Sequence, residues 1–168
     1  MENIIDSISK AIRDKNWYSA LAVSLMIPDI CTALEHERTN GGRYADWFQE
    51  NLIQYDGFLS GNDCYALRCS LLHEARDDIT TQRCRDVLER YLFTTSGLHL
   101  GLFTENYLNG ERIPSILVLN VQHFCEDVCA AATKWLEANK RDAQIQTRLG
   151  QTIKIYRPGE SYKGVIGF

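Results

Sequence analysis

The sequence lacks the features that mark membrane, secreted and fibrous proteins. No apolar run approaches the roughly 20 residues of a membrane-spanning helix, and the first residues lack the basic and then apolar pattern of a secretory leader. There is no internal repeat and no low-complexity tract. The composition, with 45% hydrophobic and 24% charged residues, is that of a globular chain. We therefore predict one cytoplasmic domain over residues 1–168 with a real hydrophobic core.

Positive charge is also in deficit. The net charge of -4 excludes a general electrostatic attraction for nucleic acid, although residues 134–168 carry seven Lys or Arg against three Asp or Glu. The cysteines do not resemble a disulfide framework, which is typical of short, loop-rich secreted chains. They fall mostly in helix-like patterns, which indicates reduced thiols, and they are Cys31, Cys64, Cys69, Cys84, Cys125 and Cys129.

Helical periodicity dominates the chain. Pro28 is expected to end or kink the second helix, because proline lacks the amide donor that a helix interior uses. Asn40-Gly41-Gly42 is a loop signal, and the short polar side chains of Ser60-Gly61-Asn62-Asp63 are expected to cap the start of the next helix. The expected helices cover about residues 4–12, 17–25, 30–37, 44–53, 63–74, 83–91 and 124–140.

The pattern becomes β-favouring between about residues 92 and 122. Leu98–Phe103 and Ile116–Val121 are rich in strand-forming residues, and Asn109-Gly110 between them is a strong hairpin signal. A small antiparallel sheet is therefore expected before the last helix. The predicted fold class is α+β, mainly α.

The C-terminal tail, about residues 151–168, is predicted to be extended. Thr152–Tyr156 is expected to form a strand, Arg157-Pro158-Gly159 a turn, and residues 164–167 a second strand. The tail could pair with the hairpin or dock on another chain.

One stretch carries a sharp chemical pattern. In DCYALRCSLLHE, residues 63–74, Arg68 is followed after four residues by His73. Histidine titrates near neutrality and can take a proton from a hydroxyl. A guanidinium presents a fork of donors that suits phosphate oxygens.

This stretch resembles the signature of the HEPN superfamily, compact bundles of antiparallel helices in which an Arg precedes a His by a similar interval. The resemblance covers about residues 2–91 and 124–140 and leaves the β segments outside. It implies a metal-independent endoribonuclease without a cofactor, in which Arg68 binds the scissile phosphate and His73 transfers protons at the ribose 2′-hydroxyl. It also implies a homodimer, RNA as substrate, no membrane partner, and a toxin or antiviral-defence setting with a cognate antitoxin or other protein partner.

Helix geometry bears on this interpretation. Residues five apart lie about 140° apart around a helix axis and about 7.5 Å along it. Arg68 and His73 should therefore not share one face, so a single chain would make a poor site. A two-fold dimer, as the resemblance implies, would bring two motifs into one cleft.

Other interpretations of these residues stay open. Cys69 stands where active HEPN members usually carry a polar residue, which favours a catalytically inactive interaction or scaffold domain. Arg68 could simply pair with a neighbouring acid, and His73 could be placed by the helix dipole. Cys69 and His73, with the equally spaced Cys125 and Cys129, could bind zinc.

Two further patterns are weaker. Cys69 with His73 could form a nucleophilic site, but no oxyanion hole is indicated. His36, His99 and His123 have no partner pattern, so we interpret them as ordinary surface or interface histidines.

Overall fold

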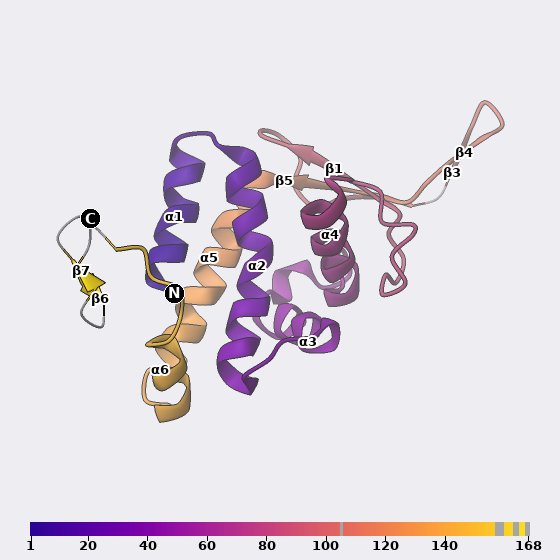
Figure 1. Cartoon of the computed structure of the whole chain (residues 1–168). Helices are drawn as coiled ribbons and strands as arrows, with labels where there is room; N and C mark the ends of the chain where they lie inside the picture. Colours follow the sequence, from indigo (N-terminus) through magenta and orange to yellow (C-terminus); the bar gives the residue numbers. More distant parts are fainter. Residues whose placement is uncertain (105, 157–159, 163–164, 167–168) are drawn as a thin grey trace.

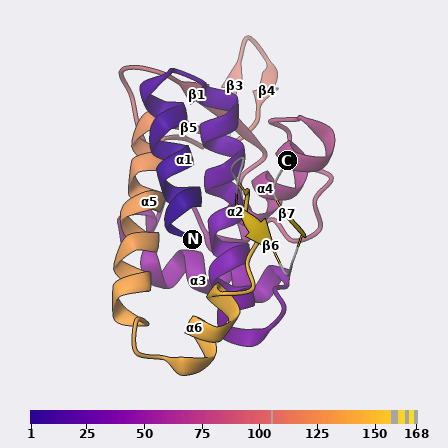
Figure 2. The same ribbon diagram turned by 60° about the vertical axis from the view of Figure 1, so that its left-hand side comes forward.

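The computed structural model describes residues 1–104, 106–156, 160–162 and 165–166, and it is an α+β structure. Helices α1, α2 and α5 lie side by side, and α3 and α4 pack on the other side of α2 (Figures 1 and 2). The helices are α1 (Glu2–Arg13), α2 (Trp17–His36), α3 (Gly41–Asn51), the 3-10 helix η1 (Ile53–Tyr55), α4 (Gly61–Glu74), α5 (Val121–Ala138) and α6 (Ala143–Leu149).

Helix α2 is the centre of the bundle. It packs against α1, α3, α4, α5 and α6, and it is apolar on most sides, as expected of a core helix. Within the described residues it is the one helix long and apolar enough to cross a membrane, with a mean hydropathy of 1.4, and half of that stretch is buried inside the protein. The sequence analysis did not predict a helix of this length, because it placed an end or a kink at Pro28.

Two helix ends differ from the sequence-based prediction. Pro28 does not end α2, which continues to His36. Asn40 caps α3 by accepting a 3.0 Å hydrogen bond from the Arg43 amide, so the glycines after it open the helix instead of forming a loop. The predicted cap at Ser60 is confirmed, since its hydroxyl accepts a 3.1 Å hydrogen bond from the Asp63 amide.

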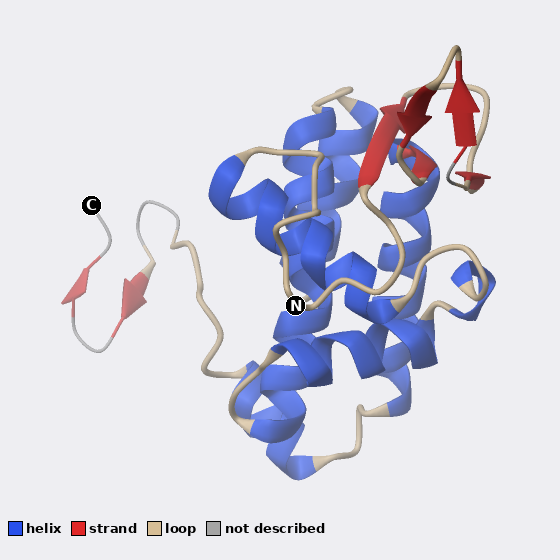
Figure 3. Cartoon of the chain, turned by 90° about the vertical axis from the view of Figure 1, so that its right-hand side faces the viewer, coloured by secondary structure: helices blue, strands red, loops and turns tan. Residues whose placement is uncertain are grey.

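The sheet is mixed, which corrects the prediction of an antiparallel one. Its strand order is β1-β5-β2, where β1 (Arg90–Thr94) runs parallel to β5 (Ile116–Asn120) and β2 (Gly101–Phe103) runs antiparallel to β5. The parallel pair arises because a long connection separates the two strands. Figure 3 shows this sheet at one end of the helices.

The predicted turn at Asn109-Gly110 is confirmed, although the strands that flank it were not predicted. Strands β3 (Asn106–Leu108) and β4 (Glu111–Ile113) pair antiparallel across Asn109-Gly110, and both turn residues have positive φ. That conformation matches the turn that this dipeptide favours. The hairpin extends away from the three-stranded sheet (Figure 1).

The prediction of a helix at residues 83–91 is wrong. The amides of residues 86–88 donate to the Asp63 carboxylate, and those of Glu89 and Arg90 donate to the Ser115 carbonyl. These long-range acceptors take the place of the i-4 carbonyls of a helix. The segment is therefore a loop that leads into β1.

The C-terminal part also differs from the prediction. Helix α6 was not anticipated, and residues 153–156 form no strand. Strands β6 (Ser161–Tyr162) and β7 (Val165–Ile166) pair with each other. The predicted turn at Arg157-Pro158-Gly159 lies outside the described residues.

Candidate functional site

Helix α4 brings Arg68 and His73 together within one chain. Nη1 of Arg68 lies 3.2 Å from Nε2 of His73. His73 is exposed in the last turn of the helix, which ends at Glu74. The angular separation of about 140° does not keep the pair apart, because the arginine side chain is long enough to reach the imidazole. The two side chains therefore meet within one chain, although the two residues lie on different faces of the helix.

Asp29 on α2 holds the guanidinium in place. Its Oδ2 accepts a 2.9 Å hydrogen bond from Nε of Arg68, and the two side chains are only 14% and 23% exposed. Its Oδ1 accepts a 3.1 Å hydrogen bond from the Thr39 hydroxyl. Burial lowers the pKa of Arg68, but Asp29 and, after it, Cys69 together raise that pKa. Arg68 is thus a paired cation, as one interpretation of the sequence proposed, with the acid on another helix.

The contact between the two side chains determines which nitrogen of His73 accepts a hydrogen bond. A guanidinium has only donors, so Nε2 of His73 must be the unprotonated nitrogen that accepts. A group that draws Nη1 away from Nε2 would free a basic nitrogen at the protein surface.

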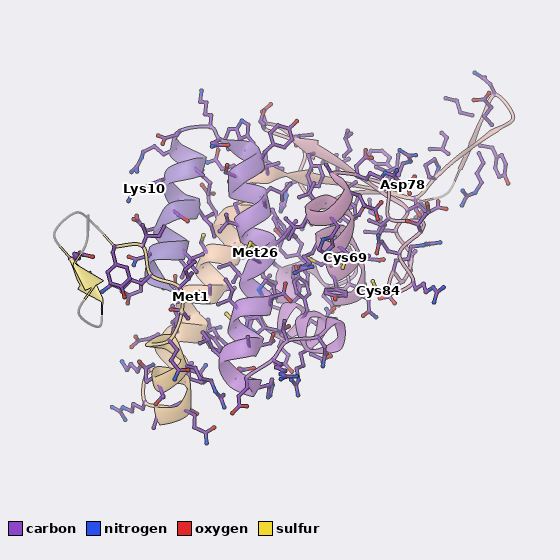
Figure 4. The ribbon with its side chains drawn as sticks, viewed as in Figure 1. Met1, Lys10, Met26, Cys69, Asp78 and Cys84 are labelled. Atoms are coloured by element: carbon purple, nitrogen blue, oxygen red, sulfur yellow. The ribbon has the colours of Figure 1, made fainter. Side chains whose placement is uncertain are left out.

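The Cys69 thiol does not form a pair with His73. It interacts with the hydroxyl of Tyr65 and with the Arg68 guanidinium. Burial raises the pKa of the Cys84 thiol, which lies near Cys69 (Figure 4). Because Nε2 of His73 faces Arg68, the structure does not assemble the Cys-His nucleophilic site.

The four zinc candidates are not brought together. Cys125 and Cys129 are buried on α5, where burial raises their pKa to about 12 and about 11. Zinc requires thiolates, so this burial opposes binding. Within residues 1–104, 106–156, 160–162 and 165–166, no three His, Cys, Asp or Glu side chains form a cluster that could hold a metal ion.

Sequence reasoning missed a second polar cluster. The Tyr55 hydroxyl donates a 2.9 Å hydrogen bond to Oδ2 of Asp127 and lies 3.2 Å from Nε2 of His99. The backbone amide of Asn120 donates to Nδ1 of His99 at 3.2 Å. The His99 and His123 rings also touch edge to face, 5.3 Å apart. His99 is therefore a hydrogen-bonded, largely buried residue, which differs from the expectation of an ordinary surface or interface histidine without a partner.

The direction of these hydrogen bonds defines the cluster. Since Nδ1 of His99 accepts from an amide, Nε2 carries the proton and donates to Tyr55, which donates to Asp127. Burial lowers the pKa of His99, although Asp127 opposes that effect. Burial and then Asp127 raise the pKa of Tyr55. Through these hydrogen bonds, the cluster connects η1 with the junction between β5 and α5.

A weak sequence signal marked part of this cluster. His123 and Asp127 are spaced i, i+4 and so lie on one face of α5. Tyr55 and His99 come from distant segments that no local pattern connects to them.

Comparisons with protein-family models, curated proteins and solved structures gave no match to the chain. The HEPN resemblance therefore depends on the Arg68 and His73 motif and on its helical surroundings.

Proposed function

We propose that the chain is a metal-independent endoribonuclease that acts as a homodimer through Arg68 and His73. The observation that carries the proposal is the 3.2 Å contact between the Arg68 guanidinium and the exposed His73 ring. Asp29 orients the guanidinium from its Nε edge and leaves Nη1 directed at the imidazole. A phosphate-binding cation and a proton-transfer group thus lie side by side.

A chemical sequence follows from this arrangement. An RNA phosphate competes with Nε2 of His73 for the Arg68 guanidinium, because a charged oxygen is the stronger acceptor. The released imidazole then takes the proton of the 2′-hydroxyl. The 2′-oxygen attacks phosphorus, a 2′,3′-cyclic phosphate forms, and the bond to the 5′-oxygen breaks. Arg68 stabilises the negative charge that develops on the phosphate.

The leaving 5′-oxygen also needs a proton. One His73 imidazole acts as the base, so a second imidazole, released from its own Arg68 by the RNA and protonated, must act as the acid. The partner subunit's His73 would supply it in a two-fold dimer, the commonest oligomer. All six cysteines are free, in keeping with a reducing compartment, and we place the enzyme in the cytoplasm in a toxin-like or antiviral-defence role.

RNA cleavage by the purified protein tests the proposal. Wild-type protein should cut RNA in the presence of a metal chelator and leave 2′,3′-cyclic phosphate ends. His73→Ala should abolish cleavage, whereas His36→Ala, which removes an exposed histidine at the end of α2, should not. Cleavage that survives His73→Ala would contradict the proposal.

A catalytically inactive interaction domain is the second candidate. It is favoured by the ion pair that Arg68 already forms with Asp29 and by the cysteine that follows the arginine. In that case clean wild-type protein cuts none of a varied set of RNAs.

A further inference from the structure

The turn between α2 and α3 places two more arginines beside the candidate site. Nη1 of Arg43 donates a 2.6 Å hydrogen bond to the Arg38 carbonyl. Thr39, between them, donates from its hydroxyl to Oδ1 of Asp29 at 3.1 Å. The other oxygen of Asp29 binds Arg68 at 2.9 Å. A continuous set of contacts therefore joins Arg38 and Arg43, which we call the arginine edge, to Arg68.

The start of α3 also lies against α4 near the site. A Cβ added at Gly41 would come within 2.6 Å of the Tyr65 ring, so the absence of a side chain allows the close approach. Tyr65 precedes Arg68 by three residues, or about one helical turn. Arg43 lies in the first turn of α3, where the backbone amides add partial positive charge.

Two acids near the arginine edge are already engaged by other cations. Asp29 pairs with Arg68, and Glu37 pairs with Arg148 at 3.2 Å. Among the described residues, the Arg43 guanidinium donates to the Arg38 carbonyl and not to Asp46, which is exposed three residues later. Within the described part of the chain, neither residue of the arginine edge has a carboxylate partner, and Arg38 is exposed. Positive charge therefore remains available here although the whole chain carries -4.

We infer that the arginine edge binds phosphates of the RNA nucleotides next to the scissile one. Guanidinium forks suit phosphate oxygens, and each phosphate contact contributes to affinity by releasing counterions. The partner is single-stranded RNA, the substrate class of the proposed nuclease. This inference rests on the proposed nuclease function, because the edge is placed to hold that enzyme's substrate.

Binding of an uncleavable RNA tests the edge separately from the chemistry. An RNA with 2′-O-methyl groups throughout cannot undergo the 2′-hydroxyl attack, so its affinity reports contacts alone. The test variant is Arg38→Gln/Arg43→Gln. The matched control is Arg13→Gln/Lys15→Gln, which removes two charges near the other end of α2, about 30 Å away.

The expected effect is quantitative. Each lost contact with single-stranded RNA should reduce the slope of log affinity against log salt by about 0.7, which is about five-fold in affinity at 0.1 M salt. The double variant should therefore bind about 25-fold more weakly, with the slope reduced by about 1.4. The control should match wild-type in both quantities. Arg43→Lys keeps the positive charge, so it should retain most of the dependence of affinity on salt. This result would show that the loss in the double variant comes from the missing charge and not from misfolding.

The outcomes separate the inference from the proposed function. No binding of the uncleavable RNA by wild-type protein, or an equal loss in the control, overturns the inference. The inference is also overturned if the arginine-edge variant cleaves RNA through His73 with an unchanged KM. That result would leave the proposed nuclease function intact. Binding that depends on the arginine edge without any RNA cleavage supports the inference as an RNA-binding surface and overturns the nuclease.

Discussion

Replacing Asp63 with alanine should destabilise the protein more than most single substitutions. Asp63 is 2% exposed in the first turn of α4. Its two oxygens accept hydrogen bonds of 2.8, 3.2 and 3.3 Å from the amides of Asp86, Val87 and Leu88. The variant leaves all three donors without a protein partner, and the loop that replaces the predicted helix loses its attachment.

The magnitude follows from the environment of each donor. A hydrogen bond to a charged group contributes about 1.5–3 kcal/mol, and an unsatisfied buried donor is costly. The Leu88 bond is fully buried, whereas the other two are partly buried, so water can replace some of their loss. We expect a loss of about 3–4 kcal/mol in the free energy of unfolding. For a chain of this size that corresponds to a melting temperature about 10 °C lower.

Urea unfolding followed by circular dichroism measures this loss, with thermal melts as a second readout. The matched control is Asp6→Ala, which removes a carboxylate that is 59% exposed and pairs with Lys10 on the surface of α1. It should change stability by less than about 0.5 kcal/mol. A loss below about 1 kcal/mol in Asp63→Ala, or equal losses in both variants, would refute the role we assign to this carboxylate.

Three further predictions concern the two polar clusters. Asp29→Ala should lower kcat for RNA cleavage by on the order of 100-fold, because Arg68 loses the contact that orients it, and an unchanged kcat in single-turnover assays would contradict this. Tyr55→Phe should reduce stability by about 1–2 kcal/mol in urea unfolding, because Asp127 loses its buried donor; a neutral effect would show that the hydroxyl contributes nothing. Since folding lowers the pKa of His99 from its ordinary value of 6.5, the stability that this group contributes should be complete above pH 6.5 and decrease as pH falls below it. His99→Gln should flatten that part of the stability profile, and a profile identical to wild-type would exclude this histidine as its source.

Short-range interactions explain which elements could be predicted. The cap at Ser60 acts over three residues, and the turn at Asn109-Gly110 depends on the φ preferences of two residues. Most helices show in the spacing of apolar residues within a few turns. These parts of the fold are encoded locally, so they agree with the structure.

Long-range partners explain most of the failures. The loop at residues 83–91 has helical periodicity, but Asp63 binds its amides from 23 to 25 positions away. The pairing of β1 with β5 depends on contacts across more than 20 residues. No local pattern specifies such partners, and tertiary hydrogen bonds outweigh a weak helix propensity.

The candidate site also has features that the sequence specifies locally and features that depend on long-range contacts. The sequence alone identified Arg68 and His73, because their interval and their position late in a helix are local properties. Only the tertiary structure decided what they contact: Asp29, 39 residues away, orients the guanidinium, and a long side chain closes the angular gap to the imidazole. Packing against α2 also placed the arginine edge beside them, since the position of one helix against another depends on the whole core and on no single segment.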